Sequence, residues 1–324
     1  MNTIYYTLNL QLFAVPETLA KTTTPEMSAT MKTFYNRSLL ENAREASVFD
    51  QFAMPTPMTH GKTAEWRRFK TFAPALEPMT EGVIPAGKTL GMVTVTANLS
   101  QHGDFAPVSD VLEMTAIDPV IYGATEEMGA AGAETNDLLI RNDLLAGTNK
   151  IYAGSANSQS AVAKTEYLTP ALVNKAVTFL KKMKAPKING YYVAVIHPSV
   201  AEDLRNSEEW KEFHKYNDTT PIFKGEIGEL HGVKFIESNF AKVDGSKGDV
   251  RYSTMIFGKD AFGKLDLDGG GMEMIIHGKE EIGGPLNQYS TVGYKFMHGS
   301  AILYQERIVN VWTSSSYCAI DEAN

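Results

Sequence analysis

The sequence predicts an α+β protein, and three observations carry that prediction. Residues 93–100 alternate apolar and polar side chains, the period of a half-buried strand. Residues 118–146 keep apolar side chains at spacings of three, four or seven, the period of a helix. In the second half of the chain, short apolar runs alternate with amphipathic segments.

The first fifty residues predict an extended arm followed by one short helix. Residues 14–30 are rich in Thr, Pro and small polar residues, which bury too little apolar area to fold alone. From Ser28 onward, apolar side chains recur at helical spacing, and we expect this helix to end before the proline-rich residues 54–57. Residues 1–13 lack the basic start and cleavage site of a secretory signal, so we interpret them as an arm.

Residues 60–104 predict two long strands joined by a broad loop. One strand contains Trp66 to Lys70 and the other Val93 to Ser100, and the connection at residues 74–91 is rich in proline and glycine. A lone two-stranded ribbon is marginally stable in water. This hairpin therefore needs a partner surface.

A long helix is expected from Asp118 to about Ala146. Asp118 is a capping carboxylate and Pro119 suits the first helical position, while the apolar pattern stops near Gly147. At 1.5 Å per residue the helix would be about 43 Å long. It would form a spine longer than most globular helices.

The second half predicts a compact α+β unit. Thr169 and Pro170 begin a helix that ends in lysines, residues 191–196 form a buried strand, and Pro198 begins a shorter helix. Further strands are expected at residues 233–236, 254–257, 272–277, 294–304 and 308–312.

Composition excludes several classes of protein. The 30 basic and 38 acidic residues give a net charge of −8, which argues against a dedicated DNA-binding protein. No run of eighteen apolar residues appears, so no membrane span is expected. Cys318 is the only cysteine, so the fold cannot depend on an internal disulfide, and a reducing cytoplasm suits the chain.

No motif predicts catalytic, cofactor-binding or metal-binding residues, and we expect the protein not to be an enzyme. The seven histidines form no HExxH motif or close pair, and Glu212 and His214 would point apart on a helix. Gly269–Gly271 and Gly283–Pro285 lack the spacing of phosphate loops and predict turns, no G-x-S-x-G motif is present, and Cys318 has no surrounding motif. An unrecognised hydrolase or transferase stays open as an alternative.

The order of elements resembles the subunit of HK97-type phage capsids: an arm, a helix, a long hairpin, a spine helix, an α+β unit and a returning strand. Within that fold the chain looks like the N4-type coliphage capsid family. The short motifs that carry this resemblance are NLQLFA at residues 9–14, FYNRSLL at residues 34–40 and the spine at residues 126–150.

The resemblance implies a division of the chain into five parts. These are an arm and short helix at 1–50, an extended hairpin (E-loop) at 51–115, a peripheral domain with the spine helix at 116–153, an axial α+β domain at 154–290, and C-terminal strands at 291–324 that return to the peripheral domain.

The resemblance also implies self-assembly into pentamers and hexamers of an icosahedral shell around double-stranded DNA. We expect weak non-specific contact with DNA, portal, scaffolding or decoration proteins as possible partners, no cofactor and no membrane partner. The location would be the virion capsid, assembled in the host bacterial cytoplasm. An encapsulin-like shell around cargo enzyme is the alternative.

The hairpin supplies the candidate subunit-interface residues, because it would lie over a neighbouring subunit. They are Trp66, Arg67, Arg68, Phe69 and Lys70. The mixture of basic and aromatic groups could also contact nucleic acid, but the patch is small. We expect Arg67 and Arg68 to pair with acidic groups of a neighbour.

Overall fold

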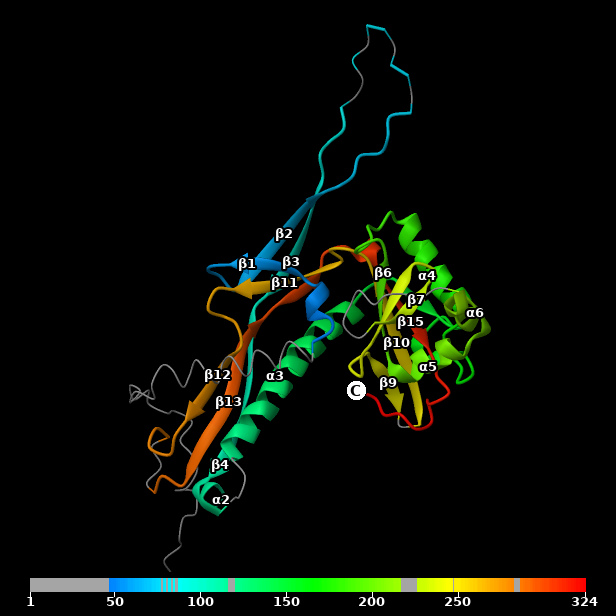
Figure 1. Ribbon diagram of the computed structural model, residues 1–324. Helices are drawn as coiled ribbons and strands as arrows, with labels where there is room; N and C mark the ends of the chain where they lie inside the picture. Colours follow the sequence, from blue (N-terminus) through cyan, green and yellow to red (C-terminus); the bar gives the residue numbers. More distant parts are fainter. Residues whose placement is uncertain are drawn as a thin grey trace, which may run out of the picture. The chain divides into compact units, whose positions relative to one another are not determined.

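The computed structural model describes residues 47–324, except for 77, 80, 83, 85–86, 116–119, 217–225, 247 and 283–285. The predicted arm, the predicted first helix, the Asp118–Pro119 helix start and the Gly283–Pro285 turn lie outside these residues. The described chain forms two units (Figure 1). Unit 1 contains Gly103–Gly132 and Met272–Phe296, and unit 2 contains Ala46–His102, Ala133–Gly271 and Met297–Asn324.

Unit 2 is built on a seven-stranded sheet. Its strands run in the order β5 (Lys150–Tyr152), β15 (Ile308–Thr313), β10 (Asp249–Phe257), β6 (Tyr192–Ile196), β8 (Val233–Glu237) and β7 (Glu226–Leu230), with β9 (Val243–Ser246) also paired to β10. Every residue of β6 and β15 is buried, as the continuous apolar runs predict for strands covered on both faces.

Helices α4 (Pro170–Lys182), α5 (Pro198–Asn206) and α6 (Glu208–Tyr216) belong to the same unit. The predicted start of α4 is confirmed, because the Thr169 hydroxyl accepts a hydrogen bond from the Leu172 N–H and Pro170 follows the cap. α4 buries Val173, Val177 and Leu180 in a cluster with side chains of α5 and the sheet. Burying each such side chain contributes about 1.5–3 kcal/mol.

A three-stranded sheet of unit 2 joins β1 (Met54–Met58), β11 (Phe262–Leu267) and β14 (Ser300–Ile302) in that order. β1 was not predicted from the sequence, because two prolines argue against a strand. Pro55 and Pro57 are tolerated because β1 is an edge strand, paired only with β11 within the described chain.

Strands β2 (Thr63–Phe69) and β3 (Met92–Asn98) form the predicted hairpin. They pair antiparallel from Thr63 opposite Asn98 to Phe69 opposite Met92. The two-stranded pairing is confirmed, and the wide loop of residues 70–91 joins the strands.

Unit 1 contains the greater part of a sheet ordered β12 (Glu273–His277), β13 (Tyr289–His298), β4 (Ser100–Ser109), with α2 (Asp110–Thr115) and the first half of α3 (Val120–Leu145). Met274 and Val292 pack with Ile121 and Met128 of α3. Gly103 permits close packing of β4 on β13, since a Cβ there would lie 2.5 Å from the Tyr294 carbonyl oxygen.

The long spine helix is confirmed as α3, a continuous helix of 26 residues. The strand predicted at 294–304 was wrong as a single element, because the chain breaks at Gly299 and β13 and β14 join different sheets. The five-part division of the chain stays a prediction. Its last part, 291–324, is divided between the units: residues 291–296 of β13 belong to unit 1, whereas β15 belongs to the seven-stranded sheet of unit 2, between β10 and the edge strand β5.

Candidate subunit interface

Strand β2 alternates between half-buried and exposed side chains, so the five candidate residues do not share one environment. Trp66 and Arg68 are half-buried, whereas Arg67, Phe69 and Lys70 are exposed. The Trp66 indole N–H donates to the Thr56 hydroxyl at 2.9 Å. Trp66 is therefore held by its own chain, through β1.

Arg68 also has partners in its own chain. Its guanidinium lies 3.2 Å from the Glu306 carboxylate and 4.6 Å from the centre of the Tyr304 ring, and Arg307 stacks on the same ring at 3.6 Å. Arg68 therefore does not need an acidic group of a neighbouring subunit to pair its charge. Trp66 and Arg68 fix the base of the hairpin.

Arg67 pairs with Glu65 on the exposed face of the same strand, at 2.6 Å. The hydrogen bond from Arg67 lowers the pKa of the Glu65 carboxyl. Both side chains are well exposed to solvent, and such pairs contribute little to stability. Arg67 thus stays accessible to a partner.

The loop beyond β2 and β3 carries apolar side chains that the described part of the chain leaves exposed. Every described residue from 70 to 90 is exposed. The large apolar side chains of this surface, here called the hairpin patch, are Phe69, Phe72, Leu76, Met79, Ile84, Leu90 and Met92. Leu76 and Ile84 keep 88% and 93% of their surface accessible. Exposed apolar side chains gathered in this way are a candidate interaction site.

Among the described residues of the loop, hydrogen bonds are few and lie near its base. The Lys70 N–H donates to the Gly91 carbonyl at 2.8 Å, and the Lys88 ammonium donates to the Ala73 carbonyl. The hairpin patch was not among the predicted site residues beyond Phe69. Its apolar side chains are visible in the sequence, but they follow no period that distinguishes a patch from a core.

Two histidines that are far apart in the sequence lie close together in the structure. His102 and His298, 196 positions apart, lie with ring centres 6.1 Å apart, a proximity that sequence spacing could not predict. The His298 ring bonds Asn136 at 2.9 Å and Ser300 at 3.2 Å. Burial lowers the pKa of His298. Across the described residues, no three His, Cys, Asp or Glu side chains converge as metal ligands would.

The other predicted motifs have ordinary structural roles. Gly269–Gly271 forms a turn after β11, in which the Gly270 N–H donates to the Leu267 carbonyl at 2.8 Å. Cys318 is buried. His214 is on α6, and its side chain lies outside the described residues. Among the described helices, none is long and apolar enough to cross a membrane.

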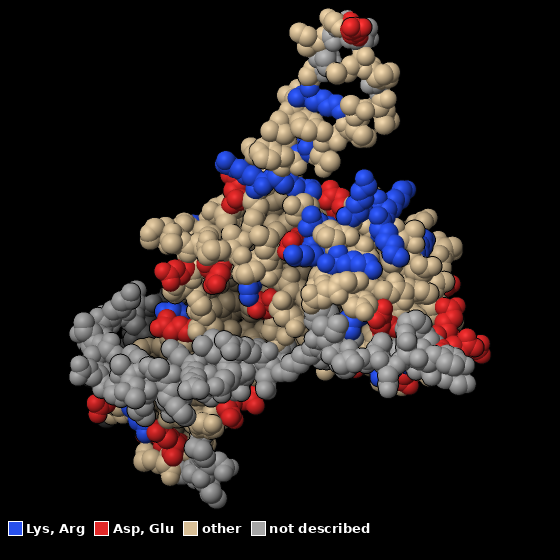
Figure 2. Space-filling model, turned by 45° about the horizontal axis from the view of Figure 1, so that its top comes forward, with Lys and Arg blue, Asp and Glu red and all other residues tan. Residues whose placement is uncertain are grey.

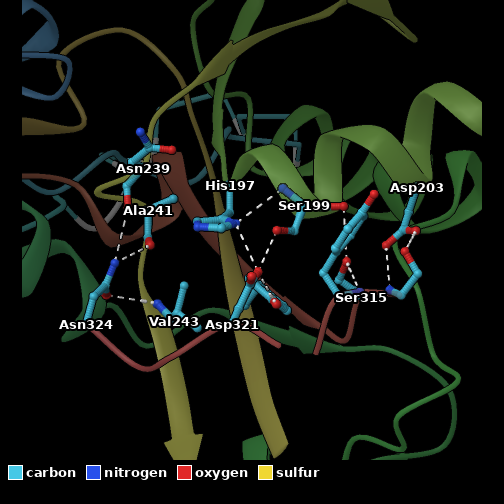
Figure 3. A network of polar contacts seen from close by, with 12 residues as sticks. His197, Ser199, Asp203, Asn239, Ala241, Val243, Ser315, Asp321 and Asn324 are labelled. Carbon is cyan, nitrogen blue, oxygen red and sulfur yellow. Dashed lines mark hydrogen bonds and ion pairs between the residues drawn. The ribbon is translucent and has the colours of Figure 1, made fainter. Parts of the chain in front are cut away.

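A polar network that the sequence analysis missed fixes the last ten residues to unit 2 (Figure 3). Asp321 accepts hydrogen bonds from the Ser199 hydroxyl at 2.5 Å and the Tyr252 hydroxyl at 2.7 Å. The Asn324 side chain accepts from the Val243 N–H and donates to the Asn239 and Ala241 carbonyls.

Ser199, His197 and Asp321 are the residue types of a hydrolytic triad, but their geometry differs from one. His197 Nδ1 accepts a hydrogen bond from the Ser199 backbone N–H, and the Ser199 hydroxyl donates directly to Asp321. A triad needs the histidine to accept the serine proton. Here the three residues hold the C-terminal segment against α5, and burial lowers the pKa of His197.

The arrangement of strands and helices is also found in solved phage capsids. The chain aligns with the capsid of Ralstonia phage GP4 at a TM-score of 0.65, with 14% identity over 94% of this chain and 97% of that one. The cyanophage Pam1 capsid aligns at 0.64, with 11% identity over 98% and 100%. The chain has the HK97-type phage capsid fold.

Two further comparisons bear on this assignment. Residues 122–266 match a family model described as phage capsid protein. A virus-like particle from Pyrococcus furiosus aligns at a lower TM-score of 0.52, with 12% identity over 87% of this chain and 99% of that one. No curated protein matches the sequence.

Proposed function

We propose that this chain is the major capsid subunit of a tailed phage, which assembles with copies of itself into pentamers and hexamers of an icosahedral shell around double-stranded DNA. The observation that carries the proposal is the hairpin patch on a capsid fold. A two-stranded ribbon with seven exposed large apolar side chains is a poor element for an isolated protein. It is a suitable element for docking on a neighbour.

The free energy of burying apolar side chains favours such docking. Burying one large apolar side chain contributes about 1.5–3 kcal/mol before ordering costs. Part of this is lost to the ordering of the loop and of the docked copy. A shell repeats the contact at every subunit boundary, so a modest net gain per contact is sufficient.

Three finer features belong to the same proposal. The motifs at residues 9–14 and 34–40 support an N4-type coliphage capsid. Portal, scaffolding or decoration proteins are its expected partners, and assembly would take place in the host bacterial cytoplasm. We also propose that the chain acts without catalysis, which the hydrogen bonding of Ser199 and His197 supports.

An encapsulin-like shell around cargo enzyme is the second candidate, because the fold is shared with the Pyrococcus furiosus particle. The higher TM-scores of the phage capsids favour the phage function. Shells that are purified from infected cells and contain nucleic acid would support the first candidate. Shells that copurify with one cargo protein and no nucleic acid would support the second.

The test is electron microscopy of the purified chain after gradient sedimentation. We expect icosahedral shells or rings of five and six for the wild type, and soluble subunits for Leu76→Asp/Ile84→Asp. Ile320→Asp is the matched control, since Ile320 is 74% exposed outside the hairpin patch. A wild type that stays monomeric at high concentration, with or without scaffolding protein, contradicts the proposal.

A further inference from the structure

Two groups of charged side chains in unit 2 lie at opposite ends of its seven-stranded sheet. Phe257 is the last residue of β10. It lies opposite Val193 near the start of β6 and opposite Ile308 at the start of β15. The loops around these positions therefore meet at one end of the sheet. The ends of β6 and β15 lead to α5 and to the C-terminal segment at the other end.

The first end is basic. Backbone hydrogen bonds join its loops. The Lys259 N–H donates to the Pro186 carbonyl and the Gly258 N–H donates to the Arg307 carbonyl, both at 2.9 Å. The cations there, which we call the basic end, are Lys181, Lys182, Lys184, Lys187, Lys259 and Arg307. Figure 2 shows Lys and Arg side chains gathered along the upper edge of this unit.

The five lysines of the basic end are exposed and form no ion pair within the described part of the chain. Asp260 is the acidic side chain beside them, and Glu306 is already paired with Arg68. Lys181 and Lys182 complement the dipole of α4. That explanation does not extend to Lys184, Lys187 or Lys259, which lie outside the helix.

The opposite end is acidic. Ser316 hydrogen-bonds to Asp203, which places α5 beside the chain that follows β15. α6 follows α5 after Ser207, and its buried Trp210 packs on Phe235 of β8 at 5.8 Å. The anions of this end, which we call the acidic end, are Glu202, Asp203, Glu208, Glu209 and Glu212. Three cations lie near these anions: Arg205 is paired with Glu237 at 2.6 Å, Lys211 is exposed, and Lys164 lies 3.7 Å from Asp249 at the start of β10.

We propose that the basic end of one copy docks on the acidic end of the next copy within a ring, an inference that rests on the proposed self-assembly. In a head-to-tail ring every copy uses two different patches, so both must be present on one chain. A unit with opposite charges at its two ends meets that requirement. The charges would steer the docking and disfavour like-to-like contacts.

A DNA backbone is the other polyanion that the basic end could bind. The second copy is favoured because the same unit carries the complementary surface, whereas a DNA contact would leave the acidic end without a role. The chain as a whole is also acidic, with a net charge of −8.

Charge reversal tests the inference. Lys182→Glu/Lys184→Glu/Lys187→Glu/Lys259→Glu leaves two cations against five anions at the basic end and so makes both ends acidic. Glu202→Lys/Glu208→Lys/Glu209→Lys makes both ends basic. Because like charges would then face each other, each variant alone is expected to lose about tenfold or more of its assembled fraction at low salt. The variant that carries all seven changes regains assembly, because its ends are complementary again. Lys175→Glu, an exposed reversal within α4, is the control and assembles normally.

Mixing the two variants sharpens the test. Equal amounts can alternate around a ring of six but not around a ring of five, so the mixture is expected to form hexamers without pentamers. Circular dichroism confirms that each variant is folded. Folded reversals that assemble like the wild type overturn the interface, and so does a loss of DNA binding with assembly unchanged. A wild type that forms no rings contradicts the proposed function itself.

Discussion

The hairpin and the seven-stranded sheet are parts of one unit, but their apolar residues differ in exposure: those of the sheet are buried, and those of the hairpin loop are exposed. All five residues of β6 are buried between layers of the same chain. Every described residue of the hairpin loop from 70 to 90 remains in water. The strands of the sheet are covered within the same chain, whereas the hairpin loop leaves its large apolar side chains exposed. Apolar side chains therefore stabilise the subunit in one region and are available for assembly in the other.

The largest difference is expected for a matched pair of Phe→Ala substitutions. Phe235 is fully buried in the sheet, and Phe72 is 49% exposed in the loop. Phe235→Ala should lower the free energy of unfolding of the subunit by about 3–5 kcal/mol. Phe72→Ala should change it by no more than about 0.5 kcal/mol. Denaturant titration of unassembled subunits measures both, and equal losses would remove the distinction between the two regions.

The second prediction concerns the segment that precedes β1. The Asp137 carboxylate on α3 accepts hydrogen bonds from the backbone N–H groups of Val48, Phe49 and Asp50, the shortest at 2.8 Å. Asp137→Ala should cost about 2–3 kcal/mol, because these donors lose a charged acceptor. The exposed Asp266→Ala is the control. Thermal unfolding gives the loss, and an effect as small as that of the control would contradict the role of Asp137.

The third prediction is a loss of subunit stability in acid. Burial lowers the pKa of His298 and of His197 below 6.5. The unfolded chain therefore takes up protons near pH 6.5 before the folded chain does, and stability falls as the pH drops through that value. The urea midpoint should decrease between pH 7.5 and 5.5.

Substitution of His298 isolates its contribution. His298→Gln should flatten the pH dependence, whereas the exposed His60→Gln should leave the slope unchanged. If the slope of the wild type and that of His298→Gln coincide, the burial of His298 is not its source.

The smallest effect is expected at the base of the hairpin. Arg68→Ala removes one ion pair with Glu306 and one cation–π contact with Tyr304, which together should cost about 1 kcal/mol. Arg67→Ala, which breaks an exposed pair on the same strand, should cost less than Arg68→Ala, because solvent screens that pair. Urea titration at low and high salt compares them, and a larger loss for Arg67→Ala would reverse the proposed assignment of the two arginines.

Local patterns predicted the elements whose signals lie within a few residues. The Thr169–Pro170 cap, the alternation in β3 and the long apolar period of α3 are all of this kind. β1 was missed because its prolines argue against a strand, and only pairing with β11, some two hundred residues later, makes it one.

The candidate site was predicted in outline. The need of the hairpin for a partner follows from its missing core, but the internal partners of Trp66 and Arg68 depend on Thr56 and Glu306, whose proximity no local pattern gives. The same holds for the hydrogen bonds from Ser199 and Tyr252 to Asp321. Contacts between distant residues were therefore the part that the sequence could not supply.

The proposed function requires that a neighbouring subunit covers the hairpin patch. Hydrogen exchange of residues 70–91 tests this most directly. In free subunits these amides should exchange rapidly, because few of them are hydrogen-bonded within the described loop. In assembled shells the same amides should be protected, while the amides of β6 and β10 stay protected in both states. Rapid exchange of residues 70–91 in intact shells would show that no neighbour covers the hairpin and would contradict the account.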